Sequence, residues 1–172
     1  VGLAAMMAAK VRGAAEIVAI DPVESRRAAA IDLGATHAVD PGDDDAVAAI
    51  RSATGGRGAD FVFEAVGRPA TIELAVKATR RGGTTCIVGA AAPDAMVSLS
   101  AYDLYMHAKT LVGCQYGSIV PNRDFPMLLN LWRTGRLPLD KLISERIPLD
   151  DVNVAFDDLR SGSGIRSVIV NG

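Results

Sequence analysis

Runs of apolar residues alternate with amphipathic stretches through the first two thirds of the chain. Short apolar runs bounded by glycine, proline or aspartate predict strands that are buried in a sheet. Between these runs, apolar residues recur every three or four positions, which predicts helices. The opening residues, rich in alanine and methionine, predict a helix before the first strand. The predicted strands cover residues 16–21, 37–40, 60–67, 82–90 and 110–116, and the later helices cover 23–34, 44–53 and a segment that begins at Pro69.

Residues at the ends of two predicted helices support these boundaries. Gly34 is placed to end a helix in the left-handed conformation, and Pro69 suits a first helical turn, where no backbone N–H is needed. Continuous apolar strands separated by helices imply parallel βαβ units, with helices on both faces of the sheet. We therefore predict an α/β fold with a doubly wound, Rossmann-like parallel sheet. The helix after Pro69 has one apolar face, formed by Ile72, Ala75, Val76 and Thr79.

The pattern changes near residue 116. Two amphipathic helices follow, separated by a mixed loop and strand at residues 137–149, and a last strand is predicted at 165–170. We therefore divide the chain into residues 1–116 and residues 117–172. The apolar stripes of the two helices are Phe125, Leu128, Leu129 and Trp132, and Val152, Ala155, Phe156 and Leu159.

Composition and charge exclude several classes of protein. Hydrophobic residues make up 49% of the chain and charged residues 22%, which is enough for an ordinary core. The formal net charge is −2 with both signs scattered, so no basic face for a nucleic acid is present. No apolar stretch approaches the roughly 20 residues that span a bilayer, and the alanine-rich start lacks the charged leader of a signal peptide. These features predict a cytoplasmic globular protein that binds neither nucleic acid nor membrane.

The cysteines and histidines show no pattern of a metal site or a catalytic triad. Cys86 and Cys114 lie in strand-like runs without a Cys or His at metal-ligand spacing. We interpret them as small, buried core residues in a reducing compartment. His37 and His107 have no Ser, Cys or carboxylate in a triad pattern, so structural roles are favoured for both.

The segment YMHAK offers a rival catalytic motif. It places Tyr105 and Lys109 at the Tyr-x-x-x-Lys spacing that short-chain dehydrogenases use for proton transfer. Those enzymes need the pair on a long helix, with a serine on a preceding strand. Here the pair immediately precedes a predicted strand, and the nearest serines, Ser98 and Ser100, lie in the preceding segment. A packed tyrosine and a surface lysine are the simpler interpretation.

Gly2 and Asp21 form a partial dinucleotide-binding signal. In the dinucleotide fingerprint, the last glycine allows close helix–strand packing, and an acidic residue about 20 positions later binds the ribose hydroxyls. A predicted helix and strand separate Gly2 from Asp21, as this arrangement requires. The carboxylate would repel a 2′-phosphate and so favours NAD over NADP, although Arg26 or Arg27 could bind such a phosphate. Alternatively, Asp21 only forms a turn before Pro22.

Arg166 is a further candidate for phosphate binding. It follows the flexible sequence SGSG and opens the last predicted strand, so its guanidinium could reach a pyrophosphate. The alternative is a solvated charge at the end of a strand.

Over its whole length, the chain resembles the second half of the zinc-dependent, medium-chain alcohol dehydrogenases. The resemblance runs in order through VGLAAMMAAKVRGAAEIVAID, DLGATHAVDP, GADFVFEAVGRP, CIVGA and FDDLRSGSGIRSVIV. The segment NRDFPMLLNLWRTGRLPLDKLISERIPL is most similar to the class that includes thiol-linked formaldehyde dehydrogenases. The resemblance implies that residues 1–116 form a dinucleotide-binding domain lacking its first strand, and that residues 117–172 return to the catalytic domain.

The resemblance also implies contacts with the coenzyme. Val1 and Gly2 are similar to the end of the family's Gly-x-Gly-Gly-Val-Gly phosphate loop. Asp21 would hold the adenosine ribose, with Arg26 beside it. Arg26 and Tyr116 stand where the family often has Lys and Phe. The other implied contacts are backbone groups near the nicotinamide carboxamide, from Val88, Gly89, Ala90, Cys114, Gln115 and Tyr116, and a pyrophosphate contact from Arg166.

By this resemblance, the catalytic and structural zinc ligands would lie in an amino-terminal lobe outside these residues. The chain would then contain no catalytic residue and no metal ligand of its own. The implied enzyme transfers hydride between an alcohol, or an aldehyde adduct, and NAD, with zinc as Lewis acid. It would form a homodimer or homotetramer through the sheet edge near residues 97–115, and we expect the 172 residues to be part of a longer protein. Two alternatives are a zinc-free quinone or enoyl reductase of the same superfamily and a nucleotide-binding module without catalysis.

Overall fold

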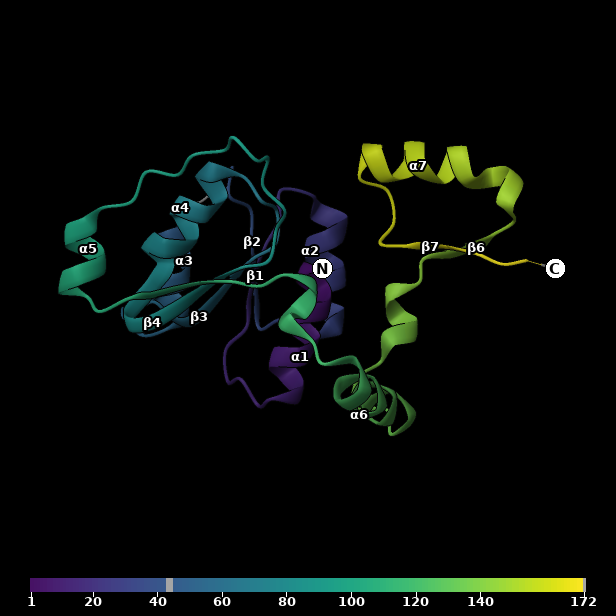
Figure 1. The fold of residues 1–172 in the computed structure, drawn as a ribbon, viewed down its shortest axis with the longest axis horizontal. Coiled ribbons are helices and arrows are strands. Elements are labelled where there is room, and N and C mark those ends of the chain that lie inside the picture. Colours follow the sequence, from purple (N-terminus) through teal and green to yellow (C-terminus); the bar gives the residue numbers. More distant parts are fainter. Residues whose placement is uncertain (43–44, 172) are drawn as a thin grey trace.

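The computed structural model describes residues 1–42 and 45–171 (Figure 1). The helices are α1 (Gly2–Val11), α2 (Glu24–Leu33), α3 (Ala46–Ala53), α4 (Pro69–Ala78), α5 (Ala101–Met106), α6 (Pro121–Arg133) and α7 (Val152–Ser161). The strands are β1 (Val18–Ile20), β2 (His37–Val39), β3 (Ala59–Glu64), β4 (Thr79–Ile87), β5 (Thr110–Gly113), β6 (Glu145–Ile147) and β7 (Ser167–Ile169). Short 3-10 turns are η1 (Tyr116–Ser118), η2 (Leu139–Leu142) and η3 (Leu149–Asp151).

All strand pairs are parallel, which confirms the predicted α/β class. Strand β1 pairs with β2, and β4 lies between β3 and β5. The orders β2–β1 and β3–β4–β5 match the two halves of a doubly wound sheet. Within the described residues, β1 and β3 do not pair with each other, so each keeps one free edge. A third parallel pair, β6–β7, comes from the last part of the chain.

A hydrophobic cluster joins the start of the chain to the segment after residue 116. It lies around α1 and α2, and residues from the loop before η2 and from η2 itself complete it. Figure 1 shows β6, β7 and α7 on the far side of α1 and α2 from the sheet β3–β4–β5. The cluster therefore anchors the last third of the chain. Its buried members are Met6, Met7, Ile17, Ala30, Leu33, Ala35, Leu137 and Leu142.

Helix α4 packs through the face that its sequence period predicts. This helix contacts both β3 and β4. Pro69 stands in its first turn, as expected. Three of the four predicted face residues, Ile72, Ala75 and Val76, lie in the helix, and the fourth, Thr79, caps it and begins β4. Each is only 3–4% exposed.

The prediction that β3 is buried on both faces is wrong. Phe61 and Phe63 are 67% and 50% exposed, although they lie in the middle of the strand. Successive side chains of a strand point to opposite faces, and Glu64 on the other face is buried. Helix α4 contacts β3, but the face with Phe61 and Phe63 stays open in the described part of the chain.

The two amphipathic helices after residue 116 form, but their apolar stripes are largely exposed. Neither α6 nor α7 has a fully buried residue within the described chain. Helix α6 contacts the central cluster through Leu128 and Leu131, whereas Phe125 and Leu129 are 56% and 47% exposed. In α7, Phe156 is 52% exposed.

Local signals at the helix ends are confirmed where they can be compared. Gly34 ends α2 with φ of 113°, as the sequence predicts. The helix expected over 44–53 is observed from Ala46; residue 44 lies outside the described residues. Asp45 caps this helix, because its Oδ1 accepts hydrogen bonds from the backbone N–H groups of Val47 at 3.0 Å and Ala48 at 3.1 Å. Among the helices described, none has the length and apolar character needed to cross a membrane.

Candidate functional site

The candidate site lies at the carboxyl ends of the parallel strands. In doubly wound sheets, ligands bind outside these ends, where the strand order reverses. Here that position lies between β1 and β3. The start of α1 reaches it, because a Cβ placed on Gly2 would be 3.9 Å from the Cβ of Ala65, just after β3. Gly2 therefore brings the amino terminus of a helix, with its free N–H groups, to this edge.

Asp21 directly follows β1 and shapes the loop that leads to α2. Its Oδ1 accepts a hydrogen bond from the N–H of Val23 at 2.9 Å, and its own N–H donates to the Val39 carbonyl at 3.3 Å. The turn-forming role proposed from the sequence is therefore real. The second carboxylate oxygen, Oδ2, accepts no hydrogen bond from a described residue. Asp21 can thus form its turn and still offer an acceptor to a ligand.

The two arginines near Asp21 differ in their surroundings. Nη1 of Arg27 donates both to Oδ2 of Asp40 and to the carbonyl of Asp21, each at 2.7 Å. Its side chain is 20% exposed, so the guanidinium is committed within the protein. Arg26 forms no ion pair with a described carboxylate, and its Nη2 would be 3.8 Å from a Cβ at Gly162. Of the two arginines, Arg26 is the one left for a ligand.

Glu64, at the end of β3, is a structural residue of this edge that sequence reasoning missed. It is 4% exposed, and its Oε1 accepts hydrogen bonds from the N–H groups of Val66 and Gly67 and from the Thr71 hydroxyl, at 2.8–2.9 Å. Oε2 is buried and has no partner among the described residues. The signal in the sequence was a single acid inside an apolar strand, where an unpaired charge is costly.

The main chain of Glu64 also fixes the loop after β4. Its carbonyl accepts the N–H groups of Val88 at 2.8 Å and Gly89 at 3.0 Å. These two N–H groups are therefore not available to a ligand, whereas the carbonyl of Val88 accepts no hydrogen bond from a described residue. If a carboxamide binds here, its NH2 group can donate to that carbonyl.

Two glycines allow the loops after β3 and β4 to touch. A Cβ on Gly89 would lie 2.2 Å from the backbone nitrogen of Gly67, and a Cβ on Gly67 would lie 2.5 Å from the carbonyl oxygen of Ala90. Gly67 also has φ of 81°, which side chains rarely adopt. Ala90 itself is exposed at the edge. The close backbone approach leaves no room for a side chain at Gly67 or Gly89.

The segment after β5 completes the edge. Cys114 donates its N–H to the Ile87 carbonyl at 2.8 Å, and Gln115 and Tyr116 follow into η1. Tyr116 has φ of 48° and is 91% exposed, and Ser118 has φ of 51°, so two non-glycine residues of one turn are left-handed. Such conformations cost free energy and cluster at functional sites.

The two thiols lie near this edge. Cys86 and Cys114 are both free and half-buried, so the expectation of two fully buried core cysteines is wrong. Burial raises the pKa of the Cys86 thiol, and neighbouring Cys114 raises it further. Cys86 lies inside β4, near its end, and Cys114 directly follows β5.

Val1 and Arg166 lie at the two ends of the chain. Val1 is 74% exposed and directly precedes α1. Arg166 is exposed and forms no ion pair within the described residues; its backbone is held by Ser144, whose N–H donates to the Arg166 carbonyl at 2.8 Å. The nearby Gly162 would contact Val23 through a Cβ at 3.7 Å. The glycine-rich loop before Arg166 therefore lies beside the loop of Asp21.

The rival Tyr–Lys motif is not a catalytic pair. The Lys109 ammonium is buried and donates to the Val76 carbonyl at 2.8 Å and to Asp103 at 2.9 Å, whereas Tyr105 is 81% exposed. Both belong to the opposite, amino-terminal edge of the sheet β3–β4–β5. His107 pairs with the same Asp103 carboxylate at 2.6 Å, and His37 lies 3.5 Å from Glu16 at the surface.

The described residues do not fit a zinc site. Across residues 1–42 and 45–171, no three His, Cys, Asp or Glu side chains lie close enough to hold a metal ion together. The carboxyl edge instead presents the Asp21 carboxylate, a helix amino terminus, backbone carbonyls and cations. These groups suit a ligand that has hydroxyls, phosphates and a carboxamide.

The chain matches the zinc-binding dehydrogenase family over residues 1–133. Geraniol dehydrogenase of Castellaniella defragrans is 41% identical over 171 residues, which cover 99% of this chain and 45% of that protein. An NDMA-dependent alcohol dehydrogenase of Amycolatopsis methanolica is 37% identical and is covered to 47%. The crystal structure of benzyl alcohol dehydrogenase from Acinetobacter calcoaceticus superposes with a TM-score of 0.94 at 36% identity, over 98% of this chain and 46% of that one.

The chain thus spans about half the length of the curated relatives it matches. The parallel strand pairing agrees with this structural match. The chain belongs to the zinc-binding dehydrogenase family.

Proposed function

We propose that this chain is the coenzyme-binding part of an oxidoreductase that transfers hydride between an alcohol, or an aldehyde adduct, and NAD. The observation that carries the proposal is Asp21, which follows β1 at the carboxyl edge and keeps one carboxylate oxygen free of described partners. Two ribose hydroxyls donating to a carboxylate suit this position. Bound NAD would accept the hydride, and zinc held outside this chain would polarise the alcohol oxygen.

The same edge offers a place for each remaining part of the coenzyme. The helix amino terminus at Val1 and Gly2 suits the pyrophosphate. Arg166 or Arg26 can add a guanidinium that binds the phosphate oxygens. Carbonyl groups of the loop after β4 and the backbone after β5 suit the nicotinamide carboxamide. This chain would therefore bind and orient the coenzyme. The backbone groups meant here are those of Val88, Gly89, Ala90, Cys114, Gln115 and Tyr116.

The structure around Asp21 supports NAD over NADP. A 2′-phosphate would meet the Asp21 carboxylate, and Arg27 is held by Asp40 and cannot readily neutralise it. Arg26 is the one observation in favour of the alternative, a zinc-free quinone or enoyl reductase that uses NADPH. The other alternative, a nucleotide-binding module without catalysis, would bind coenzyme and oxidise no alcohol.

We further propose that residues 1–116 form the coenzyme-binding domain and that residues 117–172 return to a catalytic domain that this chain does not contain. The exposed apolar stripes of α6 and α7 support this division, since apolar surface of this kind is normally covered. We propose a homodimer or homotetramer through residues 97–115. Tyr102 is 70% exposed there, and the outer edge of β5 pairs with no described strand. A cytoplasmic location remains part of the proposal.

A coenzyme titration of the intact protein tests the function. We expect NADH to bind more tightly than NADPH, as followed by the fluorescence of the bound nicotinamide. Asp21→Asn should weaken the affinity for NADH by at least about tenfold, because the hydrogen bonds from the ribose hydroxyls to a charged acceptor are lost. The asparagine keeps a carbonyl for the Val23 N–H, so the loop should persist. Asp32→Asn, an exposed acid on α2, is the matched control and should leave both affinities unchanged.

A second variant tests the role of Arg27. Asp40→Asn removes the ion pair of Arg27 and should release the Arg27 guanidinium toward the ribose. The affinity for NADPH should then rise by about threefold to tenfold. Equal affinities for NADH and NADPH in the unmodified protein, or no effect of Asp21→Asn, would contradict the proposed coenzyme role. Zinc content and NAD-dependent oxidation of simple alcohols by the intact protein then separate the dehydrogenase from its two alternatives.

A further inference from the structure

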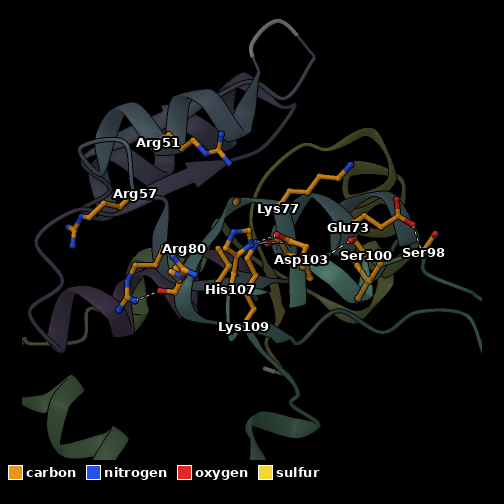
Figure 2. Close-up of a pocket in the computed structure, with 15 residues that line it drawn as sticks. Arg51, Arg57, Glu73, Lys77, Arg80, Ser98, Ser100, Asp103, His107 and Lys109 are labelled. Carbon is orange, nitrogen blue, oxygen red and sulfur yellow. Dashed lines mark hydrogen bonds and ion pairs between the residues drawn. The ribbon is translucent and has the colours of Figure 1, made fainter. Parts of the chain in front are cut away.

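A second concave site lies at the opposite edge of the sheet β3–β4–β5. It is a pocket of about 490 Å³ between the carboxyl ends of α3 and α4, the start of β4 and helix α5. Figure 2 shows Arg51, Lys77 and Arg80 among the lining residues, together with the Asp103–Lys109 pair. The coenzyme edge lies at the other ends of the same strands. A ligand here would therefore not overlap with a bound coenzyme. Arg51, Arg57 and Lys77 also lie outside residues 97–115, the segment proposed for the oligomer interface.

The pocket concentrates positive charge in a chain that is negative overall. Its lining holds six Lys or Arg side chains and two carboxylates, a formal charge of +4, whereas the whole chain carries −2. Two helix carboxyl ends subtract about one unit of charge together. Asp60, outside the lining, pairs with Arg80 at 2.6 Å and subtracts another, which still leaves about +2. The six cations are Arg51, Arg57, Lys77, Arg80, Arg81 and Lys109.

Both carboxylates of the pocket are occupied by internal partners. Asp103 accepts from Lys109 at 2.9 Å and pairs with His107 at 2.6 Å, and the Lys109 ammonium holds the pKa of that carboxyl below its ordinary value. Glu73 accepts the backbone N–H of Ser98 at 2.8 Å. Asp103 therefore neutralises Lys109, and neither acid pairs with Arg51 or Lys77.

Two of these cations have no partner in the described residues. Arg51 and Lys77 form no ion pair and no side-chain hydrogen bond with residues 1–42 or 45–171. Both lie in the last turn of a helix, where a cation commonly offsets the helix dipole. That role is already filled by other donors. The Thr54 hydroxyl donates to the carbonyl of Ile50 at the end of α3, and Lys109 donates to that of Val76 at the end of α4.

We propose that this pocket binds a small anion with at least two phosphate groups. Several separated cations around one opening match more than one anionic centre, and guanidinium groups bind phosphate oxygens in pairs. A hydroxyl donor is also available, because Ser100 Oγ accepts the Asp103 N–H at 3.1 Å and its own proton is free to donate. The volume falls in the range of small-molecule sites, about 300–1,000 Å³.

The experiment uses inorganic pyrophosphate and tripolyphosphate as probes on the intact protein, followed by titration calorimetry. We expect both probes to bind more tightly than orthophosphate, with an affinity that falls as salt is added. The double variant Arg51→Gln/Lys77→Gln should bind both probes at least about tenfold more weakly. Arg160→Gln, an exposed arginine on α7 that pairs with Asp157, is the matched control and should leave binding unchanged.

The same titration with NADH present separates this pocket from the coenzyme edge. Binding of the probes should persist at saturating NADH, since the two sites lie at opposite ends of the strands. Loss of binding under NADH, or equal binding by the double variant and the control, would overturn the proposal. The double variant and the control are also compared without coenzyme. A failure of the protein to bind NADH would therefore refute the proposed function without affecting the test of this pocket.

Discussion

Helices α4 and α6 carry the same kind of apolar stripe but lie in different surroundings. The stripe of α4 faces the sheet, and its residues are 3–4% exposed. The stripe of α6 touches the central cluster through Leu128, while Phe125 remains 56% exposed. Helix α4 therefore completes its packing within the chain, and helix α6 does not. The period of a helix predicts which face is apolar, but it does not predict which partner covers that face.

The largest expected effect tests this difference directly. In the 172-residue chain, Ile72→Ala should lower the free energy of unfolding by about 3 kcal/mol, because it opens a cavity between α4 and the sheet. Phe125→Ala should lower it by less than about 1 kcal/mol, since that ring is already mostly hydrated. Urea unfolding of both variants provides the measurement. If α6 docks on a further domain, the cost of Phe125→Ala should increase in the longer protein; equal costs in both would contradict our division at residue 116.

The contact between the loops after β3 and β4 gives the next largest effect. Gly89→Ala should destabilise the fold by about 2–3 kcal/mol, because the new Cβ would lie 2.2 Å from backbone that cannot move aside easily. It should also weaken NADH binding. Gly113→Ala, in β5, is the control, since its Cβ meets nothing within 4 Å. Urea unfolding measures the stability of the two variants, and NADH titration measures their affinity for the coenzyme. Equal stability of the two variants would show that these loops are not in close contact.

The Asp103–Lys109 pair should give an effect that depends on pH. Asp103→Asn leaves the buried Lys109 ammonium without its counter-charge and should cost about 2 kcal/mol near neutral pH. The pKa of Asp103 is lowered in the folded state, so the stabilisation is complete above the ordinary value of 3.8 and is lost as pH falls through the lowered pKa. Urea unfolding between about pH 7 and pH 3 should show the two proteins converging at the acid end. A constant difference would contradict the assignment.

The smallest effect compares two helix caps, one on each side of the division. Asp45→Ala removes a side chain that accepts two backbone N–H groups of α3, and it should cost about 1 kcal/mol. Asp151 stands at the same position of α7 but its side chain makes no capping hydrogen bond, so Asp151→Ala should cost close to nothing. Thermal unfolding of both variants is the measurement. A cost at Asp151 equal to that at Asp45 would show that α7 is capped in solution.

Much of the fold could be predicted because its signals are local. Gly34 and Pro69 mark helix ends through backbone geometry, and the α4 face follows from spacing alone. The burial of β3 could not be predicted in this way. An apolar run is compatible with burial on one face or on both, and only the position of α4 shows that Phe61 and Phe63 lie on the open face.

The candidate site was predictable only in part for a similar reason. Gly2 and Asp21 are recognisable because the fingerprint fixes their spacing along the chain. The Arg27–Asp40 pair and the network around Glu64 join residues from different strands and loops, and no sequence spacing encodes them.

By itself, the sequence determined the alternation of strands and helices, the parallel class of the sheet and the acid after β1, because each depends on residues that are neighbours along the chain. Only the tertiary structure decided which arginine near Asp21 is free, which thiols are half-buried and where six cations gather around one pocket. These properties depend on distances between segments far apart in sequence. Burial and charge pairing arise only when those segments pack together.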